Sequence, residues 1–139
     1  MSHIKRLKIE TFTIFEAGSN QVFLEMGPRY NPPQDDTTVL RVGHKTVDSG
    51  GISVLLEQGD LLILQASLEL GHQWNFAGLQ TMAQLYQPRH ERQELTIWWK
   101  GSGRARTFHI TRDQADSMAA WISDALVYGW TGWKSGVTE

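Results

Sequence analysis

Residues 94–111, ELTIWWKGSGRARTFHIT, constrain the fold more than any other stretch of the chain. Apolar and polar residues alternate on both sides of a glycine-rich centre, as in two antiparallel strands joined by a short turn. Keeping all the apolar residues on one face requires a two-residue turn at residues 102–103 or a four-residue loop at 101–104. The segment is therefore predicted to be a β-hairpin.

The alternation gives this hairpin an inner and an outer face. The predicted inner face holds Leu95, Ile97, Trp99, Phe108 and Ile110, with Ile97 opposite Phe108 and Trp99 opposite Arg106. The predicted outer face holds Thr96, Trp98, Lys100, Thr107 and His109. One tryptophan is thus expected on the core side, and the other is expected to point outward beside a lysine.

A helix with a capping box is predicted directly after the hairpin. Thr111 suits the N-cap position and Gln114 stands three residues later. The helix is expected over residues 112–128, with Gly129 as its stop. Its predicted inner stripe consists of Ala115, Met118, Ala119, Ile122, Ala125 and Leu126.

The middle of the chain is predicted to hold two more strands and the other helix. Residues 51–70, GISVLLEQGDLLILQASLEL, show apolar runs on both sides of a Gln-Gly-Asp turn signal at 58–60, which indicates strand, turn and buried strand. Apolar residues then recur at intervals of three and four over residues 75–87, which favours a helix that ends before Pro88.

The N-terminal third is predicted to contain strands and two loops. Residues 4–15 and 21–26 read as a strand pair, and residues 38–42 as a short strand. Proline, glycine and aspartate are concentrated at residues 27–38, and glycine again at 43–51. Both stretches are predicted to be mobile loops.

These elements predict one α+β domain over residues 1–139. It is expected to contain one strongly bent antiparallel sheet of about six or seven strands, two helices and a short aromatic tail at 130–139. The order of a strand hairpin followed by a capped helix resembles small single-strand DNA binders of the Whirly type. This resemblance of fold implies that strands form the binding face and that a helix covers the back.

Composition narrows the class of protein. The chain has no cysteine, which excludes disulfides, thiolate metal sites and a cysteine nucleophile. It has no apolar run long enough to cross a bilayer and no signal-peptide pattern at its start. We therefore expect a cytoplasmic protein.

The sequence contains no reaction signature. The five histidines form no H-E-x-x-H pair, and Asp35-Asp36 alone offers too few ligands for a hard cation. No nucleophile elbow, Walker-type loop or dinucleotide fingerprint occurs. We predict a non-enzymatic protein with no catalytic residue, no metal site and no cofactor.

Basic and aromatic residues are concentrated in the same part of the chain. Residues 89–112 carry six basic and two acidic side chains, whereas the net charge of the whole chain is −2. Five of the six tryptophans stand at or after position 98. The residues predicted to bind nucleic acid are Trp98, Lys100, Arg104, Arg106, His109, Arg89 and Arg92.

Aromatic platforms that stack on bases, combined with cations that contact phosphates, are typical of single-strand binding. The first functional prediction is therefore a single-stranded nucleic-acid-binding protein. The alternative is a protein-interaction module (an adaptor, chaperone or inhibitor) that uses the same patch, because tryptophan and arginine dominate protein interfaces. The basic hairpin also fits a solvated edge that discourages aggregation. A homodimer is compatible with both functions.

Overall fold

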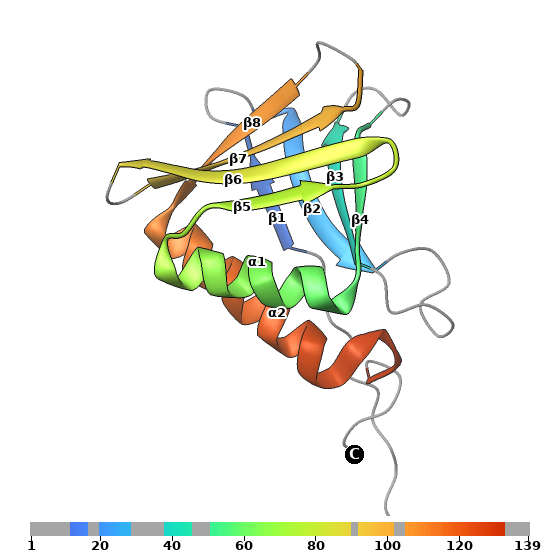
Figure 1. Ribbon diagram of the computed structural model, residues 1–139, viewed down its shortest axis with the longest axis vertical. Coiled ribbons are helices and arrows are strands. Elements are labelled where there is room, and N and C mark those ends of the chain that lie inside the picture. The colour runs from blue at the N-terminus through green and yellow to red at the C-terminus, as the bar shows by residue number, and fades with distance from the viewer. Residues whose placement is uncertain are drawn as a thin grey trace, which may run out of the picture.

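The computed structural model describes residues 12–16, 20–28, 38–45, 51–89, 92–101 and 105–132. At residues 28, 88–89 and 128–132 it describes the backbone only. The described residues form eight strands and two helices (Figure 1). The elements are β1 (Phe12–Phe15), β2 (Val22–Pro28), β3 (Thr38–His44), β4 (Ser53–Leu56), α1 (Gln58–Leu70), β5 (Trp74–Ala77), β6 (Thr81–Arg89), β7 (Arg92–Trp99), β8 (Ala105–Thr111) and α2 (Arg112–Gly132).

The strands form two antiparallel four-stranded sheets instead of the single bent sheet that the sequence predicts. Sheet A has the order β1-β2-β3-β4, and sheet B has the order β5-β6-β7-β8. Each sheet is a simple meander that is followed by one helix, so the same order of elements occurs twice. The α+β class is confirmed. The single sheet is wrong, because among the described residues no strand of sheet A pairs with a strand of sheet B.

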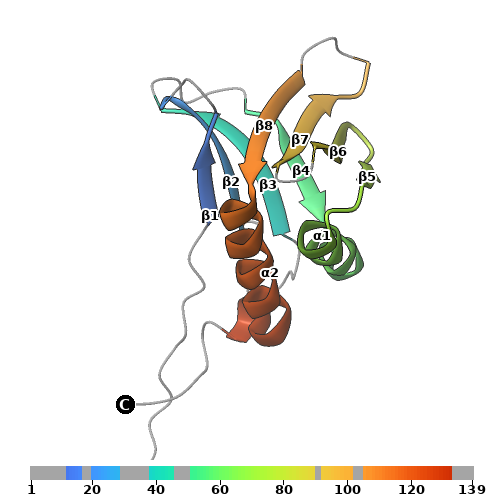
Figure 2. The same ribbon diagram turned by 90° about the vertical axis from the view of Figure 1, so that its left-hand side faces the viewer.

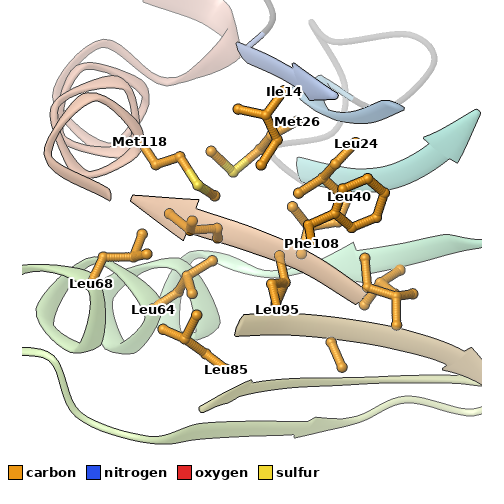
Figure 3. Close-up of a cluster of buried hydrophobic side chains, with 14 of the residues drawn as sticks. Ile14, Leu24, Met26, Leu40, Leu64, Leu68, Leu85, Leu95, Phe108 and Met118 are labelled. Carbon is orange, nitrogen blue, oxygen red and sulfur yellow. The ribbon is translucent and has the colours of Figure 1, made fainter. Parts of the chain in front are cut away.

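The core lies between the inner faces of the two sheets, and both helices pack at one end of it. Figure 2 shows the helices below the strands, and Figure 3 shows side chains from both sheets and both helices converging. Fully buried members of this cluster are Leu24, Met26, Leu40, Leu64, Leu68, Leu85, Leu95, Phe108 and Met118. The helices therefore complete the core at that end.

Residues 61–70 form a helix, whereas the sequence analysis predicts a strand. The buried side chains are Leu61, Leu64 and Leu68, which recur at three and four. The Glu57 backbone N–H donates to Oδ2 of Asp60 at 3.0 Å, so the Gln-Gly-Asp stretch begins the helix. Leu62 and Ile63 are apolar although they are exposed. They make residues 61–64 a continuous apolar run in which the helical spacing of the buried leucines cannot be recognised.

Residues 75–87 belong to the β5–β6 hairpin, so the helix predicted there is wrong. The Gly78 N–H donates to the Thr81 carbonyl at 2.9 Å across the turn, and a Cβ on Gly78 would lie only 2.9 Å from that oxygen. Ala83 and Leu85 alternate inward along β6, whereas Leu79 is almost fully exposed. The apparent helical repeat in the sequence arises because Leu79, which lies in the turn, happens to stand three residues after Phe76 and four before Ala83.

The predicted β7–β8 hairpin is present with the predicted faces. Leu95, Ile97, Phe108 and Ile110 are buried, and Trp99 packs partly buried against the core. The pairing differs by two residues, because Phe108 lies opposite Leu95 and Arg106 opposite Ile97. A shift of two keeps each paired residue on its predicted face. Lys100, which the sequence analysis places on the outer face, lies instead in the turn beyond β7.

The capped C-terminal helix is confirmed. The Gln114 N–H donates to Oγ1 of Thr111 at 3.2 Å, and the Thr111 N–H donates to Oε1 of Gln114 at 3.0 Å. The predicted inner stripe is buried or partly buried, and α2 continues past Gly129 to Gly132. Residues 133–139 of the predicted tail lie outside the described residues.

Strand predictions in the N-terminal third are confirmed where the structure describes them. Strand β1 covers the end of the predicted strand 4–15, and its start at 4–11 lies outside the described residues. Of the two predicted loops, residues 29–37 and 46–50 also lie outside them, as do Asp35 and Asp36. Within the described part of the chain, no helix is long and apolar enough to span a membrane.

Side chains from β7 and α2 bind the last carbonyls of α1. Gln93 Nε2 donates to the Ser67 carbonyl at 3.1 Å, and Arg112 Nη2 donates to the Leu68 carbonyl at 2.6 Å. Arg112 Nη2 also contacts Oδ1 of Asp116 at 2.7 Å. The final turn of a helix carries partial negative charge, so the guanidinium is well placed there. These contacts fix α1 against α2.

Replacing Arg112 with alanine is expected to lower the free energy of unfolding by about 1–2 kcal/mol, because the Leu68 carbonyl loses a charged donor. Urea unfolding followed by circular dichroism measures this loss. Arg41, which pairs with Glu25 on the exposed face of sheet A, provides the matched control. Its replacement by alanine is expected to cost less than about 1 kcal/mol. Equal losses in the two variants would contradict the assigned role of Arg112.

Candidate nucleic-acid interface

The outer face of sheet B carries Trp98, Arg92 and His109 of the residues predicted to bind nucleic acid. Its side chains alternate with the buried ones along three adjacent strands. They are Met82, Gln84 and Tyr86 on β6, Arg92, Glu94, Thr96 and Trp98 on β7, and Ala105, Thr107 and His109 on β8. All ten are partly or fully exposed, and both described helices lie at the end of the sheets (Figure 2).

Trp98 stands on this outer face, as predicted. It pairs with Ala105 on β8 and with Met82 on β6, and it is half-buried. The short Ala105 side chain leaves one side of the indole without a large neighbour on β8. An indole held between strands in this way is fixed in position, and it presents part of its surface to solvent.

Tyr86 is a second aromatic residue on the same face, and sequence reasoning did not identify it. Its side chain is 49% exposed, and its position on β6 lies opposite Glu94 on β7. The predicted helix over 75–87 includes Tyr86 in its apolar repeat of three and four, with Phe76, Leu79 and Ala83. Strand alternation from the buried Ala83 and Leu85 places it outward instead.

Polar groups lie between the two aromatic residues. The hydroxyls of Thr96 and Thr107 hydrogen-bond to each other at 2.8 Å across β7 and β8. His109 Nδ1 lies 3.3 Å from Oε1 of Glu94, although the pair does not reach hydrogen-bond geometry. Hydroxyl, imidazole and carboxylate groups thus form the centre of the face.

The predicted cations are divided between two places. Arg92 is exposed on the outer face at the end of β7 away from Trp98. Lys100 is exposed just beyond Trp99, with Nζ 3.5 Å from the Gly78 carbonyl. Both cations therefore stand at margins of the aromatic face.

Arg106 has the other orientation. It is paired with the buried Ile97, and its Nη1 lies 3.9 Å from Oε2 of Glu16. Its guanidinium is therefore directed toward sheet A and not toward Trp98. Arg104 lies outside the described residues, and of Arg89 only the backbone at the end of β6 is described. The structure thus places Trp98, Arg92 and His109 of the predicted set on the outer face of sheet B, with Lys100 in the turn beyond the end of β7.

Sheet A carries a second aromatic and basic group on its own outer face. Phe15 and Phe23 meet edge to face with ring centroids 6.3 Å apart. Lys45 Nζ lies 4.7 Å from the Phe15 centroid, and the Arg41 guanidinium lies 5.7 Å from that of Phe23. Both cations are thus already engaged with aromatic rings. No local spacing pattern indicates this group, because its four members come from three strands and a turn.

The described residues contain no cluster of three or more histidine, aspartate or glutamate side chains that would suit a metal ion. Comparison with protein-family models, with curated proteins and with solved structures finds no match to this chain.

Proposed function

We propose that the protein binds single-stranded nucleic acid through the outer face of sheet B and is not an enzyme. One observation supports this most strongly. Trp98 and Tyr86 stand on the same solvent-facing sheet surface, with Arg92 and Lys100 at its margins. Aromatic side chains stack on bases, and cations beside them neutralise phosphates.

The spacing of the two aromatic residues suits an unpaired strand. Trp98 and the position opposite Tyr86 are separated by four residues along β7, which corresponds to about 13 Å. Two separate platforms at this distance would hold two bases of one strand. In a duplex the faces of the bases are already stacked on each other, so both rings would compete with that stacking.

Each predicted residue receives a role under this proposal. Trp98 and Tyr86 stack on bases, and Arg92 and Lys100 contact phosphate. His109 supplies a hydrogen bond beside the Thr96–Thr107 pair. The guanidinium of Arg106 faces sheet A. It therefore reaches a phosphate only where the bound nucleic acid crosses the edge of sheet B at β8. Contacts from Arg89 and Arg104 remain a prediction from the sequence.

The alternative is a protein-interaction module that uses the same face. Salt sensitivity separates the two functions, because phosphate contacts release condensed counterions and aromatic protein contacts do not. Affinity for a single strand is expected to fall steeply as salt rises.

Titration of a fluorescently labelled single-stranded oligonucleotide, followed by anisotropy at low and at moderate salt, tests the proposal. A duplex of the same length is the control. Salt-sensitive binding that prefers the single strand supports the proposal. Absence of binding at low salt overturns it and favours a protein partner for this face.

Replacing Trp98 with alanine is expected to weaken single-strand binding by about 5- to 150-fold, which corresponds to the loss of one stacked base at about 1–3 kcal/mol. The same titration measures the effect. Circular dichroism is expected to show a folded variant. Phe15→Ala removes an exposed aromatic ring from sheet A and is expected to leave binding unchanged. Equal weakening by both substitutions would reject sheet B as the binding face.

A further inference from the structure

Glu94 lies at the centre of the outer face of sheet B, between two ring side chains. It stands opposite Tyr86 on β6 and opposite His109 on β8. Those two strands lie about 10 Å apart, which is twice the spacing of neighbouring strands. All three side chains are partly exposed to solvent. A ligand on this face therefore meets a carboxylate beside the Tyr86 ring.

The carboxylate of Glu94 has unused capacity to accept hydrogen bonds. Its nearest polar neighbour is Nδ1 of His109, which lies 3.3 Å from Oε1 without reaching hydrogen-bond geometry. Within the described part of the chain, no other donor forms a hydrogen bond with the carboxylate oxygens. An ionised carboxylate offers about four lone-pair sites and no donor. Both oxygens are thus open to a ligand that donates.

A carboxylate in the middle of this face works against phosphate binding in general. It repels the phosphates that Arg92 and Lys100 attract from the margins. Stacking on Trp98 and Tyr86 does not require it, because aromatic platforms bind the faces of all bases. What a carboxylate at this place can favour is a base whose edge donates hydrogen bonds.

Guanine has the base edge that matches a carboxylate best. Its N1–H and its 2-amino group are adjacent donors, and they fit the two carboxylate oxygens as a bidentate pair. Adenine and cytosine each present one amino group beside a ring nitrogen that accepts. Thymine and uracil present one N–H between two carbonyl oxygens. In these four bases an acceptor faces the carboxylate and repels it.

We propose that Glu94 makes this face select guanine at one position of the bound strand. The base stacks on Tyr86 and directs its Watson–Crick edge to the carboxylate. Side chains at directly opposed strand positions have Cβ atoms about 5 Å apart, so a base on the Tyr86 ring reaches Glu94. Trp98 has only Met82 and Ala105 opposite it and accepts any base. This inference rests on the proposed nucleic-acid binding and adds the identity of one base.

Single strands that differ in one base test this choice on the unmodified protein. A strand of thymines with one central guanine is expected to bind about 5- to 150-fold more tightly than the all-thymine strand, as one bidentate base contact provides. Replacing that guanine with hypoxanthine removes the 2-amino donor and is expected to lose most of the gain. Competition against the labelled all-thymine strand, followed by anisotropy, measures each ratio of affinities.

Glu94→Gln tests whether the carboxylate causes the preference. The amide keeps the shape of the side chain and replaces one acceptor with a donor. In this variant the ratio of the guanine to the thymine affinity is expected to fall toward one. Glu25→Gln makes the same change on the outer face of sheet A and is the matched control. It is expected to keep the ratio of the unmodified protein, and circular dichroism checks that both variants are folded.

The outcomes separate this inference from the proposed function. A guanine preference that Glu94→Gln loses and Glu25→Gln keeps supports the role of Glu94. Binding with equal affinity for the guanine and thymine strands overturns that role and leaves nucleic-acid binding in place. A preference that persists in Glu94→Gln also overturns it. Absence of binding to every strand overturns the proposed function itself, and the choice of base with it.

Discussion

Replacing Phe108 with alanine is expected to lower the free energy of unfolding by about 3–5 kcal/mol, the largest effect expected of any single substitution considered for this chain. Phe108 is fully buried on the inner face of β8. In Figure 3 its ring lies between the two sheets, beside Leu40 and near Leu95. Its removal leaves a cavity where both sheets meet, and the paired strands limit how far the surroundings can close it.

Chemical unfolding of the Phe108→Ala variant measures this loss. His109→Ala is the matched control, because it changes the next residue of the same strand on the opposite, solvent-facing side. Its expected cost is below about 1 kcal/mol. Comparable destabilisation by the two substitutions would mean that β8 does not have one buried and one solvent-facing side.

Replacing Leu64 with alanine is expected to lower the free energy of unfolding by about 2–5 kcal/mol, and replacing Leu62 is expected to lower it by less than about 1 kcal/mol. Leu64 is fully buried, whereas Leu62 is more than half exposed. In a strand, residues 62 and 64 would share one face and both substitutions would cost the same. The difference between the two losses therefore tests the helical conformation of residues 58–70. A Leu64→Ala variant that unfolds at the same urea concentration as the unmodified protein would contradict the packing of α1 in the core.

The last third of the fold follows from local sequence signals. Alternation defined the faces of β7 and β8, and the Thr111–Gln114 capping box defined the start of α2. The elements predicted over residues 58–87 are wrong because two local patterns are ambiguous: the apolar run at 61–64 and the apolar repeat over 75–87. Leu62 and Ile63 are apolar but exposed, so the helical stripe of α1 appears in the sequence as an unbroken apolar run. Leu79 is apolar but lies in a turn, where it happens to continue a helical spacing. Only packing against the rest of the molecule distinguishes these cases.

The candidate site shows the same limit. Trp98 was identified because its direction depends only on alternation within its own hairpin. Tyr86 was missed because its direction depends on β6, which the sequence analysis predicted to be helical. The direction of the Arg106 side chain toward Glu16 depends on how sheet B packs against sheet A. The packing of two sheets cannot be inferred from the spacing of residues within one strand. Pairing across strands is thus the information that one sequence lacks.

The repeated order of four strands and one helix has a consequence for folding. Residues 12–70 and 74–132 each form such a unit, and the buried side chains of both units belong to one shared core cluster. Half of the chain alone would expose Leu24, Leu40 and Leu64, or their counterparts Leu95, Phe108 and Met118. We therefore expect the two halves to unfold as one cooperative unit, and we expect a chain cleaved at residues 71–73 to regain its structure only when both fragments are present together.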